Sequence, residues 1–201
     1  MSRIIIGIDQ SYKNTGVSIV CDGKLKQVRS IRLEKLKSNS QRRRVLSQKL
    51  GSLLRLVAQK DPNAICIIER IRLRSGQQQS FINIDYIKSI GALNALIVDC
   101  CAEYNIPVYS VDTRCWKSQV VGTSKPHPNK YGVPPEKWAT VRWCISQGFE
   151  SSILVPITGR KTKGTFVHNG QRYQYNDDAS DSAAIAMFGI VGDPQKLKEE
   201  H

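Results

Sequence analysis

The sequence predicts a single α/β domain over residues 1–201, with a five-stranded mixed sheet flanked by helices. Short apolar runs rich in β-branched residues alternate with long amphipathic segments, a pattern typical of sheets that carry helices on their faces. The first strands follow one another through short turns, which predicts a three-strand antiparallel meander, and helices separate the later strands, which predicts two parallel strands. At 201 residues the chain is long enough to bury one core.

The meander is expected within the first 33 residues. Residues 4–8 form an almost continuous apolar run, as in a strand that is buried on both faces. Residues 16–21 form the second expected strand, and Asp22-Gly23 favours a tight turn into the third strand at 24–33. These three segments account for the antiparallel part of the predicted sheet.

Helices and strands alternate in the rest of the chain. A helix is expected at 40–60, because apolar residues recur on one face and Pro62 lies just beyond its end. Asn169-Gly170, between two β-prone segments, predicts a hairpin inserted at about 159–175. The other expected elements are strands at 64–68 and 106–111, helices at 83–104, 113–120, 135–147 and 177–188, and loops at 70–80 and 122–134.

The chain is strongly basic, with 30 Lys and Arg residues against 17 Asp and Glu residues and a formal net charge of +13. An excess of this size favours a polyanionic partner, of which nucleic acid is the commonest. The six cysteines form no zinc-binding pattern, no apolar run is long enough to cross a membrane, and no leader opens the chain. We therefore expect an intracellular, cytoplasmic protein that binds nucleic acid and no membrane.

Four acidic residues stand where the predicted fold would bring them together. Asp9 ends the first strand and Glu69 ends the fourth, so both would emerge at one edge of the sheet if the strands are parallel neighbours. Asp178 and Asp181, three residues apart, share one face of the last helix. Capping of the helix explains an acid at Asp177 or Asp178, but it does not explain Asp181, which lies one turn inside.

Carboxylates without accompanying histidine or cysteine ligands select a hard cation such as Mg²⁺ or Mn²⁺. Two such ions, roughly 4 Å apart, can activate a water molecule and stabilise the leaving oxygen in phosphodiester cleavage. The four carboxylates of Asp9, Glu69, Asp178 and Asp181 are therefore suited to such a cation. A negative site in a very basic chain is the combination that a metal-dependent nuclease requires.

Four short motifs carry a resemblance to one nuclease family. They are Gly7-Ile8-Asp9-Gln10-Ser11 with Thr15-Gly16, then Ile67-Ile68-Glu69, then Trp116-Lys117-Ser118-Gln119-Val120-Val121-Gly122, and finally Asp178-Ala179-Ser180-Asp181-Ser182-Ala183-Ala184-Ile185-Ala186. In content and order they resemble the motifs of RuvC-type Holliday junction resolvases, crossover junction endodeoxyribonucleases of the ribonuclease H-like superfamily. Gln10-Ser11, where the family usually has Pro-Gly, is similar to bacteriophage-like members.

The resemblance implies a ribonuclease H-like fold and a magnesium-dependent endonuclease that resolves branched DNA by paired nicks, with two metal ions in each site. Asp9, Glu69, Asp178 and Asp181 would be the metal ligands, and Lys117 would lie near the scissile phosphate. The family is homodimeric, and residues 87–98 correspond to the helix that forms much of its dimer contact. A bacterial or bacteriophage-like origin is the expected context.

Several further residues are expected to contact DNA. Arg70, Arg72 and Arg74 alternate directly after Glu69 and would line one side of the DNA channel. Arg72 stands where the family has an aromatic wedge, so Phe81 is the candidate for stacking on an unpaired base, with packing beneath the loop as the alternative. Lys137 resembles a second basic residue at the start of the family's penultimate helix.

Other functions remain open at this point. A flap, replication-fork or RNA–DNA hybrid nuclease would have the same fold and metal requirement. An actin-like ATP-binding protein is a different class, because residues 9–16 resemble a phosphate-binding hairpin, but a second Asp-x-Gly phosphate loop is missing. A DNA-binding architectural protein without catalysis is disfavoured because all four acids are present.

Overall fold

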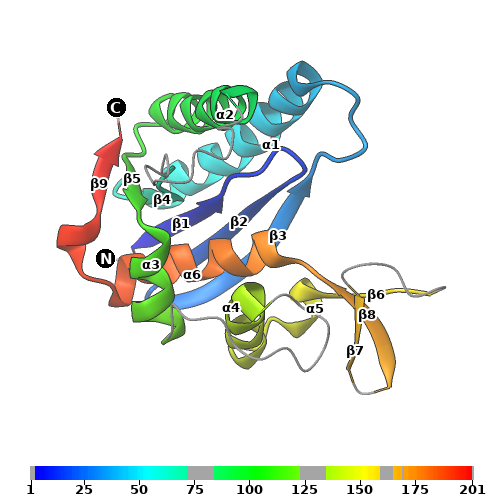
Figure 1. Ribbon diagram of the computed structural model, residues 1–201. Helices are drawn as coiled ribbons and strands as arrows, with labels where there is room; N and C mark the ends of the chain where they lie inside the picture. The colour runs from blue at the N-terminus through cyan, green and yellow to red at the C-terminus, as the bar shows by residue number, and fades with distance from the viewer. Residues whose placement is uncertain (1–2, 72–83, 123–134, 159–164, 169, 201) are drawn as a thin grey trace, which may run out of the picture.

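The computed structural model describes residues 3–71, 84–122, 135–158, 165–168 and 170–200. Its main sheet has six strands, in the spatial order β3-β2-β1-β4-β5-β9 (Figure 1). The strands are β1 (Ile4–Asp9), β2 (Asn14–Cys21), β3 (Lys24–Arg32), β4 (Ile65–Glu69), β5 (Val108–Val111) and β9 (Lys198–Glu200). The sheet forms the middle layer of the molecule.

The pairing of the strands confirms the predicted mixed sheet. β1, β2 and β3 are antiparallel neighbours, and β4 pairs parallel with both β1 and β5. The predicted number of strands was wrong, because β9 adds to the main sheet by pairing antiparallel with β5. β9 is only three residues long and consists of Lys and Glu, so it has no apolar alternation by which a strand is recognised.

Helices cover both faces of the sheet. α1 (Asn39–Lys60) and α2 (Ile84–Ala102) pack over one face and bury the larger hydrophobic core. α6 (Asp177–Val191) crosses the other face (Figure 1). The shorter helices are α3 (Thr113–Trp116), a π-helical turn η1 (Lys117–Val121), α4 (Pro135–Ser146), α5 (Glu150–Ile153) and the 3₁₀ turn η2 (Pro194–Lys196).

Alternate residues of β1 face opposite layers. Ile4, Ile6 and Ile8 belong to the core beneath α1 and α2, whereas Ile5 belongs to the core beneath α6. Because successive side chains of a strand point to opposite faces, Asp9 lies on the α6 face. The alternation of isoleucines thus determines on which side of the sheet the terminal carboxylate emerges.

Two glycines let α6 lie directly on the sheet. A Cβ atom at Gly7 would overlap the carbonyl oxygen of Ser182, and one at Gly16 would overlap the carbonyl oxygen of Asp178. These are backbone atoms of a helix, so they cannot turn aside as a flexible side chain would. Close approach of α6 to β1 and β2 therefore requires glycine at both positions.

A second, three-stranded sheet lies beside α5 and extends away from the main sheet (Figure 1). Its strands are β6 (Leu154–Pro156), β7 (Thr165–His168) and β8 (Gln171–Tyr175), with β8 in the middle and both pairings antiparallel. The predicted inserted hairpin falls on β7 and β8, and residues 159–164 and 169 of it lie outside the described residues. In the described part of the chain no helix combines the length and apolar character needed to span a membrane.

Candidate active site

Asp9 and Glu69 come from the carboxyl ends of two adjacent parallel strands. Ile8 of β1 pairs with Ile68 of β4, so the residues that follow, Asp9 and Glu69, leave the sheet side by side. Ile67 packs in the core beneath α6, and alternation therefore directs Glu69 to the same face as Asp9. The register of β1 and β4 therefore brings these two carboxylates to the same edge of the sheet, as the strand order predicted.

The start of α6 places the other two acids over this edge. The Asn176 side chain accepts a hydrogen bond from the Ala179 N–H at 3.3 Å and caps the helix, while its Nδ2 donates to Ser30 Oγ at 3.0 Å. The carbonyl of Asp178 rests on Gly16, which pairs with Asp9 across β1 and β2. Capping by Asn176 means that neither Asp177 nor Asp178 is the N-cap residue, so their carboxylates are available for other contacts.

Burial, and then mutual repulsion, raises the pKa values of the predicted acids. Burial raises the pKa of Asp9 well above its ordinary range, and the charges of Asp181, Glu69 and Asp178 raise it further. Burial also raises the pKa of Asp181, although Lys137 opposes the shift. Like charges are therefore concentrated at a place where water screens them poorly, and the ionised cluster is costly without a cation.

Glu69 and Asp178 show the same trend. Burial raises the pKa of Glu69, and Thr113 Oγ1, which donates a hydrogen bond to Glu69 Oε1 at 2.6 Å, opposes this shift. Burial, followed by the charge of Asp177, raises the pKa of Asp178 to about 7. All four predicted carboxylates thus have raised pKa values, as expected for acids that share one site.

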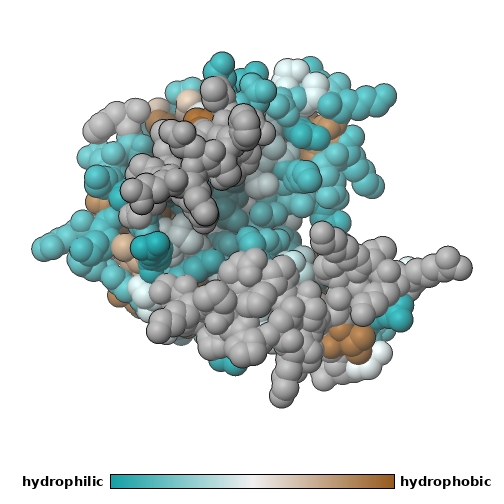
Figure 2. All heavy atoms as spheres, viewed as in Figure 1, coloured by the Kyte–Doolittle hydropathy of each residue, from teal (hydrophilic) through white to brown (hydrophobic). Residues whose placement is uncertain are grey.

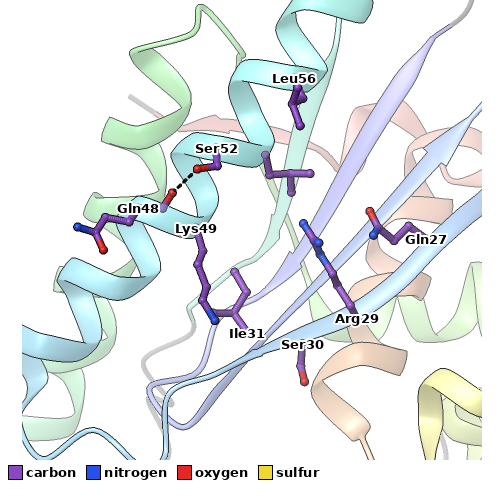
Figure 3. A pocket seen from close by; sticks show the side chains of 9 residues that line it. Gln27, Arg29, Ser30, Ile31, Gln48, Lys49, Ser52 and Leu56 are labelled. Atoms are coloured by element: carbon purple, nitrogen blue, oxygen red, sulfur yellow. Dashed lines mark hydrogen bonds between the residues drawn. The ribbon is translucent and has the colours of Figure 1, made fainter.

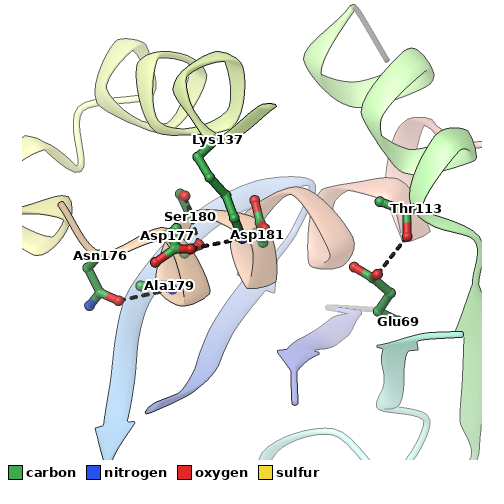
Figure 4. Close-up of polar contacts among 8 residues, drawn as sticks. All are labelled: Glu69, Thr113, Lys137, Asn176, Asp177, Ala179, Ser180 and Asp181. Atoms are coloured by element: carbon green, nitrogen blue, oxygen red, sulfur yellow. Dashed lines mark hydrogen bonds and ion pairs between the residues drawn. The ribbon is translucent and has the colours of Figure 1, made fainter. Parts of the chain in front are cut away.

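A lysine from α4 reaches into the cluster. Lys137 Nζ lies 2.8 Å from Asp177 Oδ2 and 3.6 Å from Asp181 Oδ2 (Figure 4). Burial alone would lower the pKa of Lys137, but the charges of Asp181 and Asp177 raise it above its ordinary value. Lys137 therefore stays protonated and supplies an internal positive charge to the acidic cluster.

Lys117 faces the same cluster from η1. Its positive charge lowers the pKa of both Glu69 and Asp181. Its Nζ also lies 5.1 Å from the ring centroid of the buried Trp116, a cation–π contact that holds the lysine at the start of the π-helical turn. The structure thus brings Lys117 close enough to influence Glu69 and Asp181, and its place near a scissile phosphate stays a prediction.

The remaining predicted DNA contacts have different surroundings. The Arg70 guanidinium donates to Ser110 Oγ at 3.3 Å, to Ser110 O at 3.2 Å and to Lys196 O at 3.5 Å, so it ties the end of β4 to β5 and η2. Arg72, Arg74 and Phe81 lie outside the described residues. Of the predicted basic contacts that fall within the described residues, Lys117 and Lys137 approach the acids.

Two residues of the site did not stand out in the sequence. Thr113, the hydrogen-bond donor to Glu69, follows β5 by two residues, and the position of a polar side chain just after a parallel strand was the available signal. Asp177, the nearer partner of Lys137, resembles an ordinary first-turn acid of a helix. Only the approach of α4 to α6 distinguishes it.

The chemistry of these residues fits a divalent cation. All four predicted ligands are hard oxygen donors, and Oδ1 of Asp181 is buried without a hydrogen-bond partner among the described residues. In the view of Figure 4, Asp181 lies between Lys137 and the Glu69–Thr113 pair. Within the described residues no three side chains of the His, Cys, Asp or Glu type close around a common point as metal ligands do. Lys137 Nζ, 3.6 Å from Asp181 Oδ2, is a cation that the structure places beside this carboxylate.

The raised pKa of Asp178 makes a testable prediction for the metal-free protein. An acid whose pKa rises on folding, here from 3.8 to about 7, binds its proton more tightly in the folded state, so stability is lost as pH rises through this window. Asp178→Asn removes this loss, and we expect it to stabilise the protein at pH 8 by roughly 2 kcal/mol after allowance for solvent screening. Urea unfolding in EDTA at pH 5 and pH 8 measures the effect, and a difference between parent and variant that does not change with pH would contradict it.

Comparison with known proteins addresses the fold. Neither a protein-family model nor a curated protein sequence matches the chain. Among solved structures, Thermus thermophilus RuvC in complex with Holliday junction substrate matches with a TM-score of 0.59 and 12% identity, covering 98% of this chain and 99% of that chain. A further Thermus thermophilus RuvC structure matches with a TM-score of 0.54, 12% identity and the same coverage.

A third similar structure is that of the yeast mitochondrial Holliday junction resolvase Ydc2, with a TM-score of 0.48 and 17% identity, covering 91% of this chain and 75% of that chain. The two Thermus comparisons span nearly the whole length of both proteins, so the likeness includes the meander, the parallel strands and α6. The chain therefore has the ribonuclease H-like fold of RuvC resolvases, as its motifs predicted.

Proposed function

We propose that this protein is a metal-dependent endonuclease that resolves branched DNA, four-way junctions above all, by paired nicks. The proposal is supported by the position of Asp9 and Glu69 at the ends of neighbouring parallel strands and by the charges of Asp181, Glu69 and Asp178, which all act on Asp9, in a fold similar to that of RuvC. The net charge of +13 supports an anionic substrate. The solved relative with the TM-score of 0.59 was determined with Holliday junction substrate.

Asp9, Glu69, Asp178 and Asp181 would hold the metal, which we propose to be two Mg²⁺ ions for which Mn²⁺ can substitute. Bound there, the metal would supply the acidity that activates water and stabilises the leaving oxygen. The chain's own residues prepare this site in three ways. Thr113 orients Glu69 by donating to Oε1. Packing of α6 buries the Asp181 side chain, and Lys137 balances the charge of Asp177 and Asp181.

A homodimer would present two such sites to the two cut strands of a junction. On α2 the side chains of Ile90, Leu93 and Ile97 are buried within the protomer, while Gly91 and Ala95 are exposed. Small exposed residues allow another helix to approach closely, which supports α2 as the contact between protomers. Light scattering of the purified protein tests this part of the proposal, which predicts twice the mass of 22.6 kDa.

One assay distinguishes the proposed substrate from the alternatives. The purified protein is incubated with Mg²⁺ and four-way junctions, flaps, forks, RNA–DNA hybrids or linear duplex, and the cut positions are mapped on every strand. Symmetric nicks in opposite strands of the four-way junction support the proposal. Faster cleavage of flaps, forks or hybrids would identify these as the preferred substrates, and the proposed metal-dependent cleavage would still hold. ATP hydrolysis without any DNA cleavage would favour the actin-like alternative instead.

Lys117→Ala is expected to slow junction cleavage by about 100-fold while weakening junction binding by no more than about threefold. Lys117 approaches Glu69 and Asp181 at the site of reaction, so its charge is proposed to stabilise the phosphate as cleavage proceeds. Single-turnover cleavage rates and gel-shift titrations in EDTA separate the two effects. Equal losses in rate and affinity would make Lys117 an ordinary phosphate contact.

A further inference from the structure

A groove separates the edge strand β3 from helix α1, on the face of the sheet opposite to the acidic cluster. Its volume is about 650 Å³. Gln27, Arg29 and Ile31 line it from β3, and Lys49 and Leu56 are among the residues that line it from α1 (Figure 3). In Figure 3 the side chains of Arg29 and Lys49 extend into the space between the strand and the helix from opposite walls.

The groove exists because α1 covers β3 incompletely. Gln27, Arg29 and Ile31 alternate along β3 and therefore share its α1 face. Ile31 is buried beneath α1, whereas Arg29 is exposed. Leu56 on the opposite wall keeps 53% of its surface exposed, which is unusual for a leucine in a helix that packs on a sheet. The groove is thus an open surface with an apolar floor and cationic walls.

The walls carry charge of one sign only. Neither β3 nor α1 contains an Asp or Glu residue, and Figure 2 shows a mostly hydrophilic surface around them. Within the described residues, Arg29 and Lys49 form no ion pair with an acid. The basic residues of the two elements are Lys24, Lys26, Arg29 and Arg32 on β3, and Arg42, Arg43, Arg44, Lys49, Arg55 and Lys60 on α1.

We propose that this groove binds the phosphate backbone of a DNA duplex arm, as a second contact distinct from the acidic cluster. Two cations on opposite walls of a groove whose strand and helix contain no acid suit the phosphates of a polyanion. The amides of Gln27 and Gln48 add donors for phosphate oxygens, and the exposed Leu56 can pack against sugar carbons. Contacts of this kind position the duplex without reading its sequence.

The location of the groove relative to the acids explains how a second DNA contact would act. The groove lies on the α1 side of the sheet and the acids lie on the α6 side, so one straight duplex cannot fill both. A branched molecule, whose arms diverge from the cut site, can reach around the β3 edge with one arm. This inference rests on the proposed function, since it takes DNA as the ligand, and it gives a physical reason for preferring branched over linear substrates.

The test removes the two cations that face each other across the groove. The double variant Arg29→Gln/Lys49→Gln is compared with Lys196→Gln/Lys198→Gln, which removes the same charge from exposed positions at the opposite end of the sheet. Fluorescence anisotropy with a labelled four-way junction, in EDTA and over a range of salt concentrations, measures binding. We expect the groove variant to bind roughly tenfold more weakly and its plot of log K against log salt to be shallower by about 2, one phosphate for each cation.

Several controls make the result decisive. Arg29→Lys/Lys49→Arg keeps both charges and is expected to bind like the parent, and thermal unfolding checks that the groove variant is folded. Equal losses in the groove variant and the Lys196/Lys198 variant would mean an effect of net charge and would overturn the proposal. Unchanged DNA binding would also overturn it, as would weaker binding of labelled polyglutamate alone, which would assign the groove to an acidic protein segment.

A cleavage assay distinguishes a failure of the groove proposal from a failure of the proposed nuclease function. At saturating protein, the groove variant is expected to cut the junction at the parent's rate, because none of its changed residues lies at the acids. A parent protein that cuts no DNA would refute the nuclease, while the anisotropy measurements, made without divalent cations, would still decide whether the groove binds DNA.

Discussion

Asp9→Asn is expected to lower the rate of junction cleavage by more than about 100-fold, a larger loss than the 10–100-fold typical of residues that only support a metal ligand. Asp9 is the acid on which the charges of Asp181, Glu69 and Asp178 all act, so it lies centrally among the proposed ligands. An amide keeps the size of the side chain but removes the charge that would attract the cation. Single-turnover cleavage with Mg²⁺ measures the rate.

Binding of the junction by Asp9→Asn should stay within about threefold of the parent, because phosphate contacts come from Lys and Arg side chains. Glu69→Gln and Asp181→Asn should behave in the same way. Glu34→Gln, at an exposed acid outside the site, serves as the matched control and should cut normally. If all three site variants lost binding together with cleavage, the acids would be needed for the fold or for DNA contact rather than for catalysis.

Gly16→Ala should destabilise the protein by about 1–3 kcal/mol or more, as overpacking of a close contact does. The added Cβ would occupy the space of the Asp178 carbonyl, so α6 must move away from β2. Because Asp178 and Asp181 belong to α6, the same displacement of the helix should also impair cleavage. Urea unfolding of the metal-free protein measures the stability, independently of any activity.

Gly51→Ala is the matched control for Gly16→Ala. Gly51 lies within α1, where a Cβ would meet only the Tyr104 hydroxyl oxygen at 3.6 Å, an ordinary contact. Alanine favours a helix over glycine by roughly 0.5–1 kcal/mol, so this variant should be slightly more stable than the parent. A Gly16→Ala variant that unfolds like the parent would show that α6 does not rest on β2 as closely as described.

The sequence predicted the part of the site that follows from strand periodicity. The apolar runs before Asp9 and Glu69 end where β1 and β4 end, and parallel pairing then brings the two carboxylates to one edge. The spacing of Asp178 and Asp181 likewise needed only the helical repeat. These features are local in the sequence, and the rules that govern them are regular.

The contacts between distant elements could not be predicted in this way. The pairing of Lys137 with Asp177 depends on how α4 packs against α6, and the hydrogen bonds of Arg70 depend on where the chain returns beside β5. The Asn176 side chain that caps α6 also donates a hydrogen bond to Ser30 of β3, a residue 146 positions earlier. Tertiary packing decides which distant residue each of these side chains contacts, and the local sequence pattern does not show it.

Both edge strands of the main sheet carry charged side chains, which affects how the protein behaves at high concentration. β9 closes one end with three charged residues, and β3 closes the other with Lys24, Lys26, Arg29 and Arg32 along its length. An incoming strand would have to strip water from these side chains before it could hydrogen-bond to the open backbone, which discourages amyloid-like stacking of copies. The lysines and arginines of β3 therefore protect a bare sheet edge against aggregation.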